Sequence, residues 1–273
     1  MIEALNQIND LSGGQSSGLP VRYTGRERGV VLTMHGSWHR GWWHGSEKAP
    51  RNESEQGIVD RGSFGVIDMT SHPLQCRCGT LKGVVHEPRS ANHAVCWCRD
   101  CQAFAHFLGR AGEVLDERGG TEVIQVLPRN VVFTQGVEAL ACMRLTPKGL
   151  VRWYAGCCKT PVGNTLATPK LSFIGLIHTC LEGAPEVKSL DEVFGPVRCW
   201  VNSDGAKGEP KPKVAGMGRT LGWFFGTVVR ARFNGDYRKT PFFNMATGQP
   251  VVTPRILSES EHVELKRAVL GTA

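Results

Sequence analysis

Seven cysteines in three short segments constrain this chain more than any other feature of its sequence. Three of them lie within one run of six residues, Cys96-Trp97-Cys98-Arg99-Asp100-Cys101. The other four form two close pairs, Cys76-Arg77-Cys78 upstream and Cys157-Cys158 downstream. In a reducing compartment, clustered cysteines bind metal or perform chemistry more often than they form disulfides. We therefore expect the fold to bring thiols from distant segments together around metal ions.

The sequence predicts a cytoplasmic protein. Its first residues, Met1–Asn6, have neither the basic region nor the apolar core of a secretory signal. No apolar run reaches the ~18–20 residues that span a bilayer. The three isolated cysteines, Cys142, Cys180 and Cys199, are expected to be buried apolar thiols.

Short strand-like segments separated by turn residues predict a mainly β fold of antiparallel strands with a few short helices. The 33 glycines and 15 prolines also favour turns over long helices. A short helix is expected at Arg99–Leu108, closed by Gly109. The expected strands are Leu81–Val85, Asn92–Cys96, Thr121–Leu127, Val131–Thr134, Ala139–Leu145, Leu150–Tyr154, Leu171–His178 and Val197–Val201.

Changes in composition divide the chain into three parts. Residues 1–68 contain a linker-like Ser/Gly tract and are expected to be a disordered N-terminal extension. Residues 69–205 carry all the cysteine clusters and form the expected zinc-binding β domain. Residues 206–273 form a basic loop followed by a helical C-terminal extension.

Two helices are expected in that extension. Leu221–Phe233 is apolar and flanked by arginines, so it can touch a membrane surface or, more simply, pack onto its own domain. The capping box Ser258-x-x-Glu261 predicts a terminal helix that ends near Leu270. The formal net charge of +7 is compatible with anionic partners, including nucleic acid and anionic lipid.

The spacing of the cysteines predicts two zinc sites of different kinds. Cys76 and Cys78 supply half of a tetrahedral site, and the distant pair Cys157 and Cys158 completes it as a closed structural site. The group Cys96, Cys98 and Cys101 supplies only three sulfurs, which leaves the fourth position open, as in catalytic zinc sites. A thiol bound at such an ion loses its proton and becomes a zinc thiolate.

Two alternatives stay open at this point. An iron–sulfur cluster also uses cysteine ligands, although it usually takes four at wider spacing. His93 or His106 can supply a fourth ligand to the central cysteines and make that site structural.

These motifs resemble the glutathione-dependent formaldehyde-activating enzymes, a family that includes centromere protein V. The matching segments are Cys76-Arg77-Cys78-Gly79, Cys96–Gln102 and Cys158-Lys159-Thr160-Pro161, within residues 74–180. The resemblance implies a β-tent fold with two zinc ions, with Cys76, Cys78 and Cys158 as structural ligands and Cys96, Cys98 and Cys101 as catalytic ligands. The chain departs from the family at Ala155, where the family usually has a cysteine, and Cys157 is the expected substitute.

The resemblance further implies a carbon–sulfur lyase-type activity that forms or cleaves a thiol–aldehyde adduct. The expected partners are a small thiol such as glutathione and a small aldehyde such as formaldehyde. Arg99, Arg144 and Arg152 are candidate anchors for a substrate carboxylate, against the simpler interpretation of surface ion pairs. The alternative function is a non-catalytic, zinc-stabilised binding module that uses its basic surface. Nucleic acid and a membrane surface are the less favoured partners.

Overall fold

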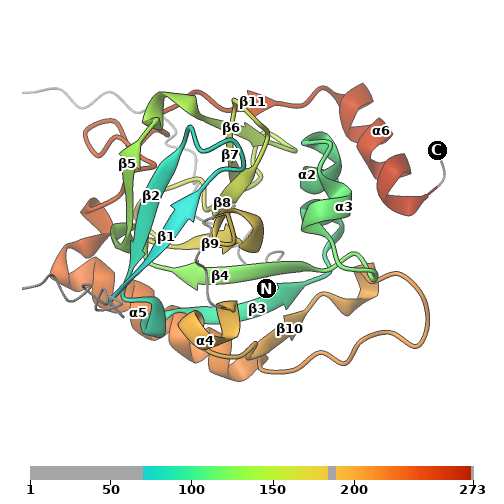
Figure 1. Ribbon diagram of the computed structural model, residues 1–273, viewed down its shortest axis with the longest axis horizontal. Helices are drawn as coiled ribbons and strands as arrows, with labels where there is room; N and C mark the ends of the chain where they lie inside the picture. Colours follow the sequence, from blue (N-terminus) through green and yellow to red (C-terminus); the bar gives the residue numbers. More distant parts are fainter. Residues whose placement is uncertain (1–69, 184–188, 272–273) are drawn as a thin grey trace, which may run out of the picture. The chain divides into compact units, whose positions relative to one another are not determined.

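The computed structural model describes residues 70–183 and 189–271, which form a mainly β structure (Figure 1). The expected N-terminal extension, residues 1–68, lies outside the described residues. The strands are β1 Ser71–Gln75, β2 Lys82–His86, β3 Asn92–Cys96, β4 Thr121–Val126, β5 Val131–Gln135, β6 Leu140–Arg144, β7 Val151–Ala155, β8 Pro161–Thr165, β9 Ile174–Ile177, β10 Cys199–Val201 and β11 Arg255–Ile256. The helices are α2 Arg99–Phe107, α3 Ala111–Val114, α4 Leu190–Phe194, α5 Met217–Asn234 and α6 Glu259–Leu270.

The strands of the described residues form two sheets. The smaller sheet has three strands in the order β1-β2-β5, all antiparallel. The larger sheet has eight strands in the order β10-β3-β4-β9-β8-β7-β6-β11. Only its two edge pairings, β10 with β3 and β11 with β6, are parallel. The expected fold class of short antiparallel strands is therefore confirmed.

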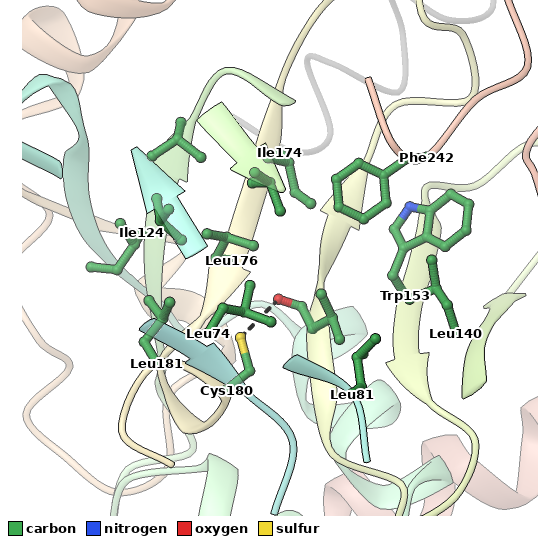
Figure 2. Packing of buried hydrophobic residues seen from close by; sticks show 14 of the residues in the cluster. Leu74, Leu81, Ile124, Leu140, Trp153, Ile174, Leu176, Cys180, Leu181 and Phe242 are labelled. Atoms are coloured by element: carbon green, nitrogen blue, oxygen red, sulfur yellow. Dashed lines mark hydrogen bonds between the residues drawn. The ribbon is translucent and has the colours of Figure 1, made fainter. Parts of the chain in front are cut away.

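Side chains from both sheets form one hydrophobic core (Figure 2). Leu74 of β1 comes from the small sheet, and Ile124, Leu176 and Trp153 come from the large sheet. Phe242, from the chain beyond α5, packs on the Trp153 ring with centroids 5.1 Å apart. Because each fully buried aliphatic or aromatic side chain stabilises a fold by roughly 1.5–3 kcal/mol, this core holds the small sheet on the large one.

The predicted helix after β3 is confirmed as α2. Asp100 places a carboxylate in its first turn, where it favours the positive end of the helix dipole. Gly109 follows the helix with φ of +66°, a left-handed conformation that glycine adopts without strain. Phe104 and Leu108 are buried against α6 and the large sheet, and Figure 1 shows α2 and α6 side by side.

The two expected C-terminal helices are present as α5 and α6. The capping box of α6 forms as predicted, because Ser258 and Glu261 each bond the backbone N–H of the other. On α5, Phe224 and Val228 pack on Phe173 and Leu150. On the same helix Phe233 is 87% exposed. No helix among the described residues is long and apolar enough to cross a bilayer.

Strand β8 is not predicted by the sequence. Its segment Pro161–Thr165 contains proline, glycine and asparagine, which usually indicate turns. All five residues are nevertheless buried, and β8 pairs with β7 and β9. A Cβ on Gly163 would lie 2.7 Å from the carbonyl oxygen of Gly175, so this glycine lets the two strands approach closely. The predicted strand Leu171–His178 is shorter in the structure because only Ile174–Ile177 pairs.

Candidate metal centres

Four cysteines from two hairpins meet at one site. The Sγ atoms of Cys76, Cys78, Cys157 and Cys158 all lie within 4.8 Å of one another. Cys78 and Cys157 are 3.3 Å apart, Cys76 and Cys78 are 3.5 Å apart, and Cys76 and Cys157 are 3.9 Å apart. A tetrahedral ion with Zn–S bonds of about 2.3 Å separates its sulfurs by ~3.8 Å. The donor set and the spacing of this four-cysteine group therefore fit a metal ion.

The two hairpin turns of this site use the same local design. Cys78-Gly79-Thr80 and Cys158-Lys159-Thr160 each place a left-handed residue between the cysteine and the threonine, with φ of 75° at Gly79 and 60° at Lys159. In each turn the threonine hydroxyl lies beside the cysteine sulfur, at 3.2 Å in the first and 3.1 Å in the second. The left-handed residue thus brings the threonine hydroxyl back to the cysteine of the same turn, and this contact orients the sulfur.

Ala155 stands where the family that the motifs resemble usually has a cysteine, but the site still contains four thiols. Ala155 ends β7 and is fully buried, and its carbonyl accepts the Lys159 N–H at 2.8 Å to close the turn. This turn directs both Cys157 and its neighbour Cys158 toward the hairpin of β1 and β2. Adjacent cysteines can therefore both reach the four-cysteine group.

The central group consists of Cys96, Cys98 and Cys101, whose Sγ atoms also lie within 4.8 Å of one another. Cys96 ends β3, Cys98 is the N-cap of α2, and Cys101 lies in the first turn of that helix. The Cys101 backbone N–H donates to Cys98 Sγ at 3.3 Å. Because helix N-termini present free N–H groups, this position suits the negative charge of thiolates.

A distant loop supports this group. Asn202 Nδ2 donates to Cys96 Sγ at 3.1 Å. Gln102 Nε2 donates to the carbonyls of Trp97 at 2.9 Å and Gly205 at 2.8 Å, which ties the loop after β10 to the central segment. Gly205 must be glycine here, since a Cβ would lie 2.0 Å from the Trp97 carbonyl oxygen. No local sequence signal indicates Asn202, because it lies 106 residues from Cys96.

The three central thiols share their protons. Hydrogen bonds from Cys101 and Cys98 lower the pKa of Cys96, and Asn202 lowers it further. The same sharing raises the pKa of Cys101 to about 12. A metal ion that takes all three as thiolates must therefore displace protons from the group.

A narrow cavity of about 30 Å³ borders the central thiols. The cavity exceeds the ~10–15 Å³ that one water needs, so it admits a very small molecule or group. Most of its lining is apolar, and the Gln125 and Asn164 amides supply the polar groups. The lining residues are Ala94, Cys96, Cys101, Val123, Gln125, Leu150, Asn164, Phe173, Gly175 and Val201.

Neither histidine considered as a fourth ligand joins the central group. Among the described residues, no histidine, aspartate or glutamate atom belongs to it. Both ring nitrogens of His93 are engaged elsewhere, Nε2 with Glu122 Oε1 at 2.5 Å and Nδ1 with the Gly195 carbonyl at 2.7 Å. His106 has a buried Nε2 with no hydrogen-bond partner in the part of the chain that the structure describes, and burial lowers its pKa.

The candidate anchors occupy three different environments. Arg99 is exposed. Arg144 donates to the Pro147 carbonyl at 2.9 Å. Arg152 is only 1% exposed, so the interpretation of this residue as a surface ion pair is wrong. Its side chain enters the interior from β7, because β7 is buried on both faces. The isolated thiols of Cys142, Cys180 and Cys199 are buried, as predicted.

The fold and the two cysteine groups define a mainly β protein with two sites that could hold metal ions. The chain belongs to the DUF6151 family, described as a family of unknown function, whose profile matches residues 69–247. No curated protein matches it. A crystal structure of a Rhodobacter sphaeroides protein is 18% identical over 47% of this chain and 99% of that one, with a TM-score of 0.30. This likeness is too weak to inform fold or chemistry.

The buried His93 gives the fold a predictable pH dependence. Because a carboxylate and a carbonyl accept from its two nitrogens, both must donate, so the ring is an imidazolium. Burial lowers the pKa of His93, but the hydrogen bonds to Glu122 and Gly195 and the charges of Glu122 and Asp191 raise it overall. The stabilisation is therefore complete below the unfolded-state pKa of about 6.5 and is lost as pH rises through the raised pKa.

We expect His93→Gln to lower the free energy of unfolding by about 1–3 kcal/mol at pH 6, since a buried hydrogen-bonded group is removed. The deficit relative to wild type should shrink as pH rises toward 9. Urea unfolding at several pH values measures it. His86→Gln, at an exposed position of β2, is the control and should have little effect at any pH. A deficit that grows with pH would contradict the assignment of an imidazolium.

Proposed function

We propose that this protein is a zinc-dependent enzyme of the carbon–sulfur lyase type, which forms or cleaves an adduct between a small thiol and a small aldehyde. The four-cysteine group holds a structural zinc and the central group holds the reactive one. Glutathione and formaldehyde are the proposed substrates, by the resemblance to the glutathione-dependent formaldehyde-activating enzymes.

The observation that carries the proposal is the difference between the two cysteine groups. The first offers four sulfurs from two hairpins, and the second offers three sulfurs with no further protein ligand among the described residues. Structural zinc sites are closed by four protein ligands, whereas catalytic sites keep one position for a substrate or water. The same chain therefore contains the donor set of each kind.

We assign zinc to both groups rather than an iron–sulfur cluster, which usually takes four cysteines at wider spacing. Thiolates are soft ligands that favour zinc, and tetrahedral all-sulfur sites are typical of zinc or iron–sulfur clusters. Cys76, Cys78 and Cys157 have sulfur–sulfur distances of 3.3–3.9 Å, and Cys158 lies within 4.8 Å of each of them, which fits a single ion. A zinc ion in the central group would lower the pKa of a thiol that occupies its fourth position, so that the thiol reacts as a thiolate.

The size of the cavity beside Cys96 and Cys101 favours a small aldehyde as the substrate. At about 30 Å³ it excludes a large aldehyde side chain, and its apolar walls keep bulk water away from the reacting atoms. The Gln125 and Asn164 amides line it, and amide N–H groups can donate to a carbonyl oxygen. Asn164 Oδ1 accepts from Arg152 Nη1 at 3.2 Å, so the amide N–H groups are the part of this side chain that could donate to a substrate oxygen.

The proposed reaction balances without an oxidant or reductant. The thiolate sulfur attacks the carbonyl carbon, a carbon–sulfur bond forms, and the π electron pair moves to the oxygen. The oxygen then takes a proton from water, which replaces the proton that the thiol released. In the reverse direction the carbon–sulfur bond breaks and the carbonyl returns. The Gln125 and Asn164 amides would stabilise the negative oxygen, a role worth about 10²–10³ in rate per donor in other enzymes.

The test is the exchange rate between free formaldehyde and its glutathione adduct. We expect zinc-loaded protein to accelerate the exchange of ¹³C-formaldehyde with glutathione, measured by exchange NMR against the spontaneous rate. Cys142→Ser, outside both cysteine groups, should behave as wild type. The proposal fails if zinc-loaded protein accelerates exchange for none of several small thiols and aldehydes.

A further inference from the structure

The most deeply buried arginine of the described chain lies beside the central thiols. Arg152 is 1% exposed, and its guanidinium contacts Asn164 Oδ1 at 3.2 Å and Asp100 Oδ2 at 3.4 Å. Its charge also lies 5.6 Å from the centre of the Phe104 ring. Removing a charge from water is costly, so this residue needs a compensating negative charge.

Asp100 alone is a weak source of that charge. Its side chain is 49% exposed, so solvent screens its single long contact with Arg152. The other groups that can supply negative charge are the sulfurs of the central cysteines, once a metal ion takes them as thiolates. Both contacts of Arg152 place it next to these sulfurs, because Asp100 lies between Cys98 and Cys101 in the first turn of α2 and Asn164 lines the same cavity as Cys96 and Cys101.

A count of formal charges explains why Arg152 accompanies the central group. Three thiolates and one divalent ion carry a net charge of −1, and Arg152 brings the buried ensemble to zero. We propose that Arg152 is a positioning residue that offsets the charge of the metal-loaded central group and thereby selects an anionic sulfur as the fourth ligand. This inference rests on the metal and thiol assigned in the proposed function.

The four-cysteine group provides a contrast within the same chain. Cys78 and Cys157 are exposed there, so water screens the charge of a loaded site. Nearby Arg77 is also exposed, with 64% of its side chain accessible. In the central group Cys96 and Cys101 are buried and Cys98 is half-buried, so an added thiolate without a neighbouring cation would be costly there. Arg152 therefore matters only at the central site.

The test measures zinc affinity at each of the two sites in Arg152→Gln, Arg152→Lys and the control Arg144→Gln. Competition with a chromophoric chelator measures zinc affinity. The zinc that is absent from a Cys98→Ser reference identifies the central site. We expect Arg152→Gln to weaken the binding of that zinc by about 10–100-fold, as for other outer partners of metal ligands. The zinc of the four-cysteine group should be unchanged. Arg152→Lys should recover part of the loss, and Arg144→Gln should match wild type.

Ligand selectivity is a readout that a purely structural role would not move. In cobalt-loaded protein, thiolate-to-metal absorption reports binding of 2-mercaptoethanol, and the ligand-field bands report imidazole. Arg152→Gln should weaken the thiol about tenfold or more relative to imidazole. Equal weakening of both ligands, unchanged zinc affinity in Arg152→Gln, or no recovery in Arg152→Lys would overturn the inference. Because these measurements need no turnover, an inactive wild type would sink the proposed reaction and leave this inference standing.

Discussion

Cys98→Ser should reduce the zinc content from two ions per chain to one and abolish turnover, while the protein stays folded. The hydroxyl of serine is a poor zinc ligand at neutral pH because it stays protonated, so the central group would keep only Cys96 and Cys101. The helix should survive, since serine is a preferred N-cap and can accept the Cys101 N–H that Cys98 Sγ accepts at 3.3 Å.

Metal analysis, circular dichroism and the exchange assay on one preparation check this prediction. Cys142→Ser is the matched control, because Cys142 is a buried thiol whose Sγ donates to the Val252 carbonyl at 3.2 Å and belongs to neither group. It should keep two zinc ions and full turnover. Retention of both zinc ions by Cys98→Ser would contradict the assignment of the central ligands.

Removal of the structural zinc should have the largest effect on stability. The four-cysteine group links the β1–β2 hairpin to the β7–β8 turn, and Arg77 N–H donates to Thr160 Oγ1 at 3.0 Å across the same junction. Structural zinc binding contributes on the order of 10 kcal/mol to folding in small zinc domains. We expect Cys76→Ser to lower the free energy of unfolding by at least ~5 kcal/mol, which corresponds to a fall in Tm of roughly 10–20 °C for a chain of this size.

Thermal unfolding with and without a zinc chelator measures the effect. In Cys98→Ser, which retains only the structural zinc, the chelator should lower Tm as strongly as Cys76→Ser does. In Cys76→Ser a further addition of chelator should change Tm much less. A chelator that removes both ions and leaves Tm unchanged would show that neither site stabilises the fold.

The sequence predicts features that depend on local pattern. The strand at β3, the helix α2 with Gly109 at its end, and the capping box of α6 all follow from spacing within a dozen residues. The two cysteine groups could also be predicted, because paired cysteines need partners from elsewhere in the chain. The structure brings each predicted group together.

Features that depend on packing between distant segments could not be predicted. Strand β8 has the composition of a turn, and its pairing depends on the approach of Gly163 to β9. Arg152 carries no sequence signal that separates a buried guanidinium from a surface one. The contact of Asn202 with Cys96 likewise joins residues more than a hundred positions apart. These long-range contacts determine the environment of the central thiols.

The proposed function depends most on how a metal ion is coordinated at the central group. A crystal structure of zinc-loaded protein, with anomalous diffraction at the zinc edge, would measure it directly. We expect one zinc bound by Cys96, Cys98 and Cys101, with a water or an added thiol as its fourth ligand beside the cavity lined by Asn164. A fourth ligand from a protein side chain, or no zinc at these three cysteines, would contradict it.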